Sequence, residues 1–294
     1  MGTAQMMETA LMMETTLAEV ETPLAFESLP TARGLHWKDG FQGYLNTGER
    51  VAQVRVDGTG AVRIRVDLDR RPAPAEALVL NASLPANLRV AGPAHRPHLL
   101  ADISARQAGF SRSLSEIRQG IRRNADGMGK GRRPSQGERG PFEHLFEQLR
   151  DGAGSLDVVD RDPGWELGLR FRGGRVAVQV SPERNGLRLY RIVLKQADLS
   201  AVDFGPGGRS VSDLALRLNE RMRFVRLAQC DAGLAVEARL SRAFATAERV
   251  VETATAIAGV SAVVRIPLQL LMQMEGVARC YADTVDLPHG ETQQ

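Results

Sequence analysis

Few residues in this 294-residue sequence have types and spacing that could support chemistry. His95 and His98 are separated by two residues, a spacing that could serve a metal site, but they lie in the proline-flanked stretch PAHRPH without a Cys or another His nearby. Structural zinc takes four protein ligands and catalytic zinc commonly takes three, so this pair is incomplete by itself. We therefore predict a solvated turn here, without a metal ion.

The acidic stretch DVVDRD is a second cluster, with Asp157, Asp160 and Asp162 close together. Such carboxylates could bind a hard cation. The stretch lacks the glycine and the distal glutamate of a calcium-binding loop, so the pattern favours an acidic turn that precedes a strand.

The motifs of common enzyme classes do not occur in the sequence. GMGKGRR places Lys130 among glycines, but no predicted strand precedes it and no Ser or Thr follows the lysine, as a phosphate-binding loop requires. The isolated histidines His36, His144 and His289 have no recognisable nucleophile or base partner. The prediction is a protein that is not an enzyme, with no catalytic, cofactor-binding or metal-binding residues.

Cysteine content and hydropathy bear on the compartment. Cys230 and Cys280 provide no disulfide framework, which fits a reducing environment, and both are interpreted as structural. The N-terminal residues lack the basic and apolar regions of a signal peptide. The longest apolar stretch, 253–274, contains Arg265 and Pro267, which is untypical of a membrane span. We predict a cytoplasmic protein in which this stretch is a core helix.

Charge gives a limited indication of partners. The net charge of +3 is too small to imply nucleic-acid binding without a concentrated patch. Residues 118–140 are such a concentration, with seven basic and two acidic residues and six glycines. Little in this stretch can be buried, so we predict a flexible linker. Nucleic-acid binding through the linker stays open as an alternative, although aromatic residues for base stacking are missing.

The sequence patterns of the elements that must position any site occur twice along the chain. LALRLNERMRFVRLA at 214–228 shares an Ala-Leu-x-Leu-Asn word, followed by an apolar-Arg-apolar-Ala step, with EALVLNASLPANLRVA at 76–91. Further matches keep the same order: Arg50-Val51-Ala52 with Arg175-Val176-Ala177, Ala101 with Ala238, and Ser104 with Ser241. A degenerate tandem duplication is the interpretation.

Hydrophobic periodicity predicts the order αβββαββα after the linker. The predicted elements are a helix at 141–152, strands at 165–172, 175–181 and 187–194 with a hairpin at Asn185-Gly186, a helix from Ser210, strands at 223–229 and 234–240, and a long helix from about 245 that breaks near Pro267. The first half predicts a related order: an uncertain helix at 12–20, a weak strand at 41–46, a hairpin at 50–68, a short helix from Pro74, strands at 87–91 and 98–104, and a helix from Ser113.

The predicted fold class is therefore α+β, with two tandem αβββαββα-type domains whose antiparallel sheets are packed by helices. The predicted layout is an N-terminal tail or weak helix at 1–20, a first domain at 21–124, a basic linker at 125–140, a second domain at 141–286 and a C-terminal tail at 287–294.

The repeated word also predicts two matched pairs of residues. Leu80 and Leu218 lie on the apolar stripes of their helices and should be buried. Asn81 and Asn219 should end the same helices, because asparagine tolerates the left-handed conformation common just past a helix end.

This order of elements, with LALRLNERMRFVRLAQCDAGLAVEARLS at 214–241 and its turn Asp231-Ala232-Gly233-Leu234, resembles type III secretion chaperone-like domains and the YbjN-like bacterial regulators that share their fold. The resemblance covers 141–265, and reaches 36–124 through the internal repeat. It implies an αβ sandwich that pairs with a second copy and binds an extended partner segment without chemistry; a tandem would form that pair within one chain.

These observations predict a bacterial, cytoplasmic, non-enzymatic protein-binding module that forms an intramolecular pseudo-dimer. The partner is expected to be a protein, assembly of two chains is left open, and a membrane partner is not expected. The alternative is a nucleic-acid-associated regulator that acts through the basic linker.

Overall fold

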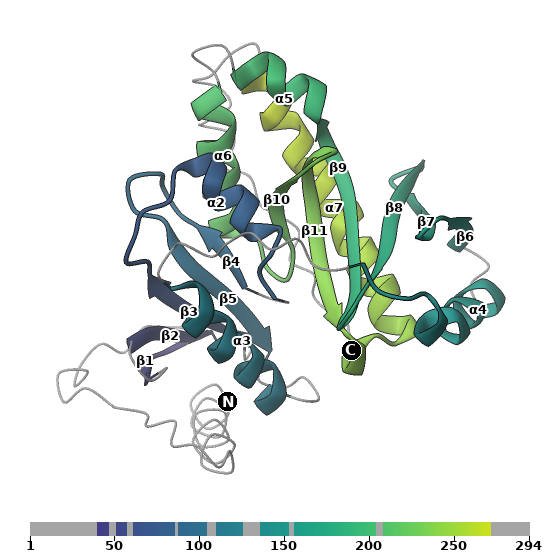
Figure 1. Ribbon diagram of the computed structural model, residues 1–294, viewed down its shortest axis with the longest axis horizontal. Helices are drawn as coiled ribbons and strands as arrows, with labels where there is room; N and C mark the ends of the chain where they lie inside the picture. Colours follow the sequence, from purple (N-terminus) through teal and green to yellow (C-terminus); the bar gives the residue numbers. More distant parts are fainter. Residues whose placement is uncertain are drawn as a thin grey trace.

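Two antiparallel sheets packed against helices form the described part of the chain (Figure 1), which confirms the predicted α+β class. The computed structural model describes residues 40–46, 51–57, 61–85, 88–104, 110–125, 136–152, 156–203 and 208–271. The predictions for 12–20, for both tails, for Lys130 and for Cys280 lie outside these residues.

The first half builds a five-stranded sheet in the order β1-β2-β3-β5-β4. Its elements are β1 (Gly40–Asn46), β2 (Val51–Asp57), β3 (Ala61–Asp67), α2 (Pro74–Asn81), β4 (Leu88–Ala91), β5 (His98–Ser104) and α3 (Phe110–Asn124).

The second half builds a six-stranded sheet in the order β10-β11-β9-β8-β7-β6. Its elements are η2 (Gly140–Phe142), α4 (Glu143–Gly152), β6 (Leu156–Arg161), β7 (Gly164–Phe171), β8 (Gly174–Glu183), β9 (Gly186–Lys195), α5 (Gln196–Asp203), α6 (Gly208–Arg221), β10 (Arg226–Cys230), β11 (Gly233–Ser241), η3 (Arg242–Phe244) and α7 (Ala247–Leu271).

The two sheets repeat one topology. If β6 is set aside, the orders β1-β2-β3-β5-β4 and β7-β8-β9-β11-β10 correspond strand by strand. The registers agree as well, because Ile64 pairs with Ala101 and Leu189 pairs with Ala238. The match of Ala101 with Ala238 in the sequence is therefore also a match in space.

One sequence match is out of register. Val54 pairs with Ile64, and Val180 pairs with Leu189, so the structure aligns Val54 with Val180. In this alignment Ala52 is equivalent to Val178 and not to Ala177. A shift of one residue turns a strand side chain to the other face, and Ala52 is buried whereas Ala177 is partly exposed. The match of Arg50-Val51-Ala52 with Arg175-Val176-Ala177 is therefore wrong by one position.

The predicted order αβββαββα also needs correction in the second half. It missed β6 and α5, so that the observed order is αββββααββα. The helix α7 does not break near Pro267 but continues to Leu271. The interior position predicted for the strand at 187–194 is confirmed, since β9 lies between β11 and β8.

Alternation explains how the second sheet packs. Trp165 and Leu167 of β7 pair with Val180 and Val178 of β8, and all four side chains are buried against the helical side of the sheet. The hairpin at Asn185-Gly186 joins β8 to β9 as predicted, and a Cβ at Gly186 would lie 2.0 Å from the carbonyl oxygen of Leu240. Glycine is required there by the close approach of β11.

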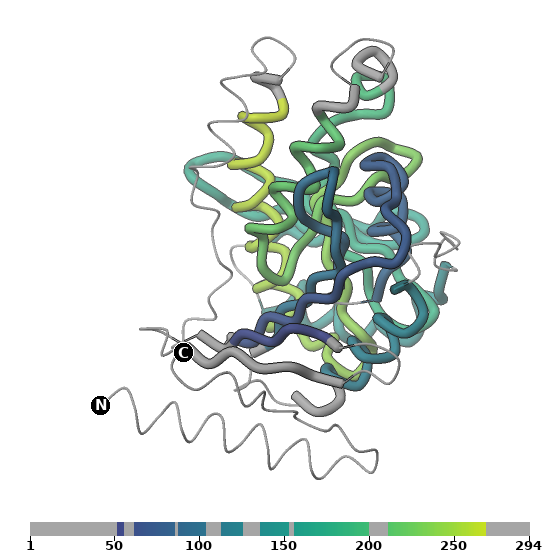
Figure 2. The backbone as a smooth tube through the Cα atoms, turned by 90° about the vertical axis from the view of Figure 1, so that its left-hand side faces the viewer, coloured from purple at the N-terminus to yellow at the C-terminus, as the bar shows by residue number. Residues whose placement is uncertain are grey.

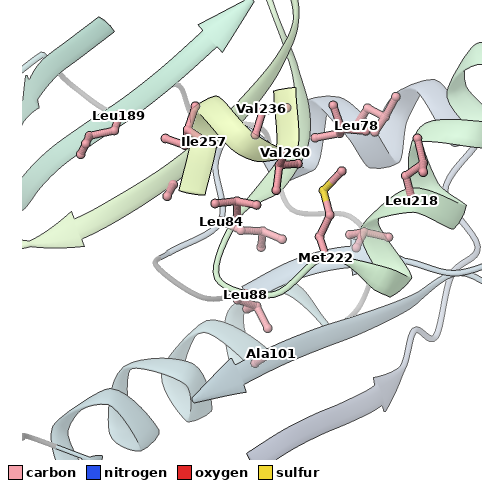
Figure 3. Packing of buried hydrophobic residues seen from close by; sticks show 14 of the residues in the cluster. Leu78, Leu84, Leu88, Ala101, Leu189, Leu218, Met222, Val236, Ile257 and Val260 are labelled. Atoms are coloured by element: carbon pink, nitrogen blue, oxygen red, sulfur yellow. The ribbon is translucent and has the colours of Figure 1, made fainter. Parts of the chain in front are cut away.

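The apolar core runs from one half into the other. Leu84, Leu88 and Met222 lie between Val236 of the second sheet and Ala101 of the first (Figure 3), and all five are buried. The buried positions predicted for Leu80 and Leu218 are confirmed, with exposed fractions of 4% and 0%.

The basic stretch at 118–140 is structured at both ends. Residues 118–124 form the last turns of α3, where Ile121 is buried, so the linker prediction is wrong for them. Residues 126–135 lie outside the described part. At the other end, the N–H of Gly137 donates to the carbonyl of Pro182 at 2.9 Å, which fixes the chain beside β8.

Candidate functional site

A pair of asparagines closes the inner edges of the two sheets. The N–H of Val90 in β4 donates to Oδ1 of Asn81 at 2.6 Å, and the N–H of Leu227 in β10 donates to Oδ1 of Asn219 at 2.6 Å. Each Nδ2 also donates to the other half of the chain, and we call the region where the two halves meet the junction. Asn81 donates to the Leu227 carbonyl at 3.1 Å, and Asn219 donates to the Val90 carbonyl at 3.4 Å. These backbone groups are therefore not free to pair with another strand.

The helices that carry the asparagines pack across the junction, α2 against β10 and α6 against β4. Figure 2 shows the dark-blue α2 among green segments of the second half. Arg89 of β4 donates from Nε to the carbonyl of Asn219 at 2.7 Å and also donates to the carbonyl of Met222. Arg63 donates to the carbonyl of Glu220 at 3.3 Å. Arginines of the first half therefore bind the C-terminal end of α6.

The second half makes the reciprocal contacts. Carbonyls at a helix C-terminus lack intrahelical donors and carry partial negative charge, so guanidinium groups are favourable there. Arg226 and Arg239 occupy this position for α2 and the segment that follows it. Their carbonyl acceptors are Leu84, Pro85 and Leu88 for Arg226, and Ala82 and Leu84 for Arg239.

A buried carboxylate balances the arginines of the first half. Asp102 lies between Arg63, whose Nε is 2.8 Å from Oδ1, and Arg89. Burial acts to raise the pKa of Asp102, but Arg89 and Arg63 hold it below its ordinary value. The carboxylate is therefore ionised at neutral pH.

A second carboxylate serves the other side of the junction. Glu237 is fully buried, with Arg226 Nη2 at 2.9 Å and Arg188 Nη2 at 2.5 Å. Burial opposes its ionisation, yet these arginines hold its pKa below the ordinary value. Burial lowers the pKa of Arg226 to about 10. Glu183, 3.1 Å from Arg239, differs because burial raises its pKa.

The charged side chains of this network are thus engaged with one another and with backbone carbonyls. They hold the two halves together. The inner strands β4 and β10 are therefore occupied, and the remaining sheet edges in the described part of the chain are β1 and β6.

The outer edge of the six-stranded sheet is β6, which pairs with β7 and with no other strand that the structure describes. Val158 and Val159 are partly exposed and lie on opposite faces of the sheet. Asp157 and Arg161 have side-chain exposed fractions of 59% each. A strand edge with unpaired backbone groups can accept an additional strand. We take β6 as the candidate site.

The helix α4 fixes this edge in place. Trp165 of β7 is fully buried and stacks on Phe146 of α4, with ring centroids 3.7 Å apart. The guanidinium of Arg139 lies 4.5 Å from the Trp165 centroid. Asp160 of β6 accepts hydrogen bonds from Arg139 at 2.8 Å and Arg150 at 3.1 Å, and the first of these holds its pKa below the ordinary value. These contacts hold β6 in a defined position at the edge of the sheet.

The two histidines considered for a metal site lie in different surroundings. His95 is exposed in a turn, as predicted. The prediction is wrong for His98, which begins β5 and is fully buried, with Nε2 3.5 Å from Oε1 of Glu220. Gly92, with φ of +99°, makes room for it, because a Cβ there would lie 2.7 Å from the imidazole.

The acidic stretch is a strand and not the predicted turn. Asp157 and Asp160 lie in β6, with Asp162 in the turn to β7. Asp157 binds Arg175 across the sheet at 2.5 Å. Among the described residues, no group of three or more His, Cys, Asp or Glu side chains is placed to hold a metal ion.

The other sequence candidates are not part of β6. His144 is exposed on α4, and Cys230 ends β10 with its Sγ 3.3 Å from the Gly233 carbonyl. His36 and His289 are outside the described residues.

The sequence did not reveal that Asn81 and Asn219 join the two halves. Asn81 ends α2 as predicted, but Asn219 is followed by two more residues of α6. Neither asparagine is among the described non-glycine residues with positive φ. The explanation that asparagine is present because it adopts the left-handed conformation at a helix end is therefore wrong. The signal that could have found their role is the repetition of Asn at the same place in the duplicated word.

Comparison of the chain with protein-family models, with curated proteins and with solved structures gave no significant match. The resemblance to type III secretion chaperones therefore stays a prediction. One helix in the described part, Ala247–Leu268, is long and apolar enough to cross a membrane by length and composition alone, and half of its most apolar window is buried inside the structure.

Proposed function

We propose that this protein is a non-enzymatic, cytoplasmic protein-binding module of the type III secretion chaperone-like kind, in which the two halves form an intramolecular pseudo-dimer. The partner contributes an extended segment that adds to the six-stranded sheet beside β6. The observation that carries the proposal is the contrast between the sheet edges: β4 and β10 are closed by Asn81 and Asn219, whereas β6 pairs on one side within the described chain.

Energetic considerations support a docked strand at β6. Main-chain hydrogen bonds from the edge supply affinity without regard to sequence, and side chains on the two faces supply selectivity. Val158 and Val159 provide one apolar contact on each face, and they are flanked by Asp157 and Asp160. A partner segment with alternating apolar residues fits this edge.

The test is a charge placed on the edge. Val159→Lys should be tolerated by the fold, because Val159 lies opposite Glu166 in β7 and is partly exposed. A lysine on an edge strand opposes the addition of another strand. The matched control is Val79→Lys on α2, where the valine is 46% exposed.

The partner is first isolated from native lysate with the wild-type chain, and its affinity for the three proteins is then measured. We expect Val159→Lys to weaken binding at least about tenfold, a loss near 1.4 kcal/mol, and Val79→Lys to bind like wild type. Equal binding by both variants would reject β6 as the site.

The nucleic-acid alternative has a separate signature. If nucleic acid co-purifies, and if replacing Arg122, Arg123, Lys130, Arg132 and Arg133 by Ala abolishes its salt-sensitive binding, the regulator function replaces the present proposal.

A further inference from the structure

The charges of β6 occur in an order that is complementary to itself. The strand reads LDVVDR, and Asp157, Val159 and Arg161 share one face because alternate side chains of a strand point the same way. Asp157 and Arg161 have side-chain exposed fractions of 59% each. Charges on an edge strand usually oppose the addition of another strand. Here, however, opposite charges flank Val159 symmetrically, so a second antiparallel β6 centred on Val159 brings each aspartate opposite an arginine.

The charges select one register for such a pair. Residues that lie opposite each other in an antiparallel ladder turn their backbone groups the same way, so two copies of one strand pair only in registers centred on a residue. A register centred on Asp160 places two aspartates opposite each other, which is destabilising. A register centred on Val158 places Asp157 opposite Val159, without an opposite charge. The register centred on Val159 places Asp157 of each chain opposite Arg161 of the other.

Ion pairs within each chain extend this arrangement. Arg175 Nη2 of β8 lies 2.5 Å from Oδ2 of Asp157, and Arg161 Nε lies 3.6 Å from Oε2 of Glu166 in β7. In the pair of strands, charges of alternating sign therefore cross from one sheet to the other. On the opposite face, Asp160 is already bound by two arginines of its own chain, so its charge is offset before a second strand arrives.

We propose that, before a partner binds, the β6 edge is occupied by β6 of a second copy of this chain. The two six-stranded sheets then form one continuous antiparallel sheet about a two-fold axis at Val159 (the position of β6 at the end of its sheet is seen in Figure 1). The inference rests on the proposed function in one respect, since a partner segment uses the same edge and must displace the second copy. Six residues on each side form a small interface, so the dissociation constant is expected on the order of 10 μM or above.

Sedimentation velocity of the full-length protein, at concentrations on either side of this value, measures the self-association. Asp157→Arg and Arg161→Asp each replace two attractive pairs by two repulsive pairs, and each variant should dimerise at least about tenfold more weakly than wild type. An equimolar mixture of the two variants should recover the dimer, because every arginine of one chain then faces an aspartate of the other. The double variant Asp157→Arg/Arg161→Asp should dimerise like wild type for the same reason.

The matched control is Arg170→Asp, which reverses an exposed charge of β7 away from the edge and should dimerise like wild type. Thermal unfolding of each variant checks that the fold is kept, as expected for exposed charges. Added salt should weaken the wild-type dimer, because exposed ion pairs are screened. A wild-type chain that stays monomeric throughout, or a mixture of the two single variants that associates no better than either alone, rejects the dimer.

The dimer and the partner site fail separately. If the wild-type chain is monomeric while its binding to the partner is weakened by Val159→Lys, only the dimer is rejected. If self-association follows the charge substitutions while partner binding is insensitive to Val159→Lys, the dimer stands and only the partner site is rejected.

Discussion

Replacing Asn219 by alanine removes the acceptor of one buried backbone donor, the N–H of Leu227. The carbonyls of Val90 and Leu227 keep a hydrogen bond, since Nδ2 of Asn81 donates to each at 3.1 Å. An orphaned buried N–H costs about 1–3 kcal/mol. The free energy of unfolding should therefore fall by about this amount. Asn81→Ala should behave alike, because Asn219 still donates to both carbonyls, at 3.4 and 3.0 Å.

The double variant Asn81→Ala/Asn219→Ala should lose more than the sum of the single changes. It orphans both N–H groups and also both carbonyls, which neither single change does. Two additional unsatisfied buried groups at about 1–3 kcal/mol each predict an excess loss of about 2–6 kcal/mol. The excess measures how far each asparagine substitutes for the other across the junction.

Equilibrium urea unfolding of the four proteins gives these free energies. The control is Asn124→Ala combined with Asn219→Ala, because Nδ2 of Asn124 bonds to the Gly120 carbonyl at 2.8 Å within its own helix. The control pair should be additive within about 0.5 kcal/mol. Additivity of Asn81→Ala and Asn219→Ala within the same limit would refute a shared closure of the two sheet edges.

Further predictions concern the core, the acid response and the joint between the halves. Leu218→Ala and Leu80→Ala should each lower the free energy of unfolding by about 2–5 kcal/mol in urea titrations, because both side chains are buried. The pKa of Asp102 is held below its ordinary value, so its ionisation stabilises the fold above about pH 4, and that contribution is lost as the pH falls through the folded-state pKa. Asp102→Asn should lower the free energy of unfolding at pH 7 by about 3–5 kcal/mol. When unfolding is measured as a function of pH, the variant should also lose less stability than wild type below about pH 4. An unchanged loss of stability at acid pH would contradict the stabilising role of ionised Asp102. After cleavage at a protease site engineered between residues 126 and 135, the two pieces should co-elute in size-exclusion chromatography, because Arg89 and Arg226 bind backbone carbonyls of the opposite half; separation in mild buffer would show that the junction is weak.

Strands with strict alternation were predicted well, and β6 was not. Trp165, Leu167 and Leu169 alternate with charged or small residues, and this period of two is a local property that sequence displays directly. LDVVDR mixes two adjacent valines with three charges, so its pattern resembles a turn. It forms a strand because β7 supplies a full ladder of partners and because Arg139 and Arg150 bind Asp160.

Pro267 shows the same limit for a helix. Proline lacks the N–H donor, and local chemistry therefore predicts a break. In the fold, Val264 and Leu268 on either side are buried against the rest of the protein, and burial of this apolar face outweighs one lost backbone hydrogen bond. Tertiary packing thus decided the length of α7.

The candidate site was only partly accessible to sequence reasoning. The repeat predicted that the chain contains two related units, but a repeated word carries no information about which surfaces of those units meet. The position of β6 depends on residues brought together from separate elements, since β7, Arg139 and Arg150 all contact it.

The sequence by itself determined the α+β class, most of the elements and the duplication, because these follow from the period of apolar residues and from the order of short words along the chain. The tertiary structure alone decided that Asn81 and Asn219 close the inner sheet edges, that Arg89 and Arg226 bind helix ends of the opposite half, and that β6 forms the outer edge. The physical reason is that hydrogen bonds and ion pairs between distant segments depend on relative position in space, which no local pattern of residues specifies.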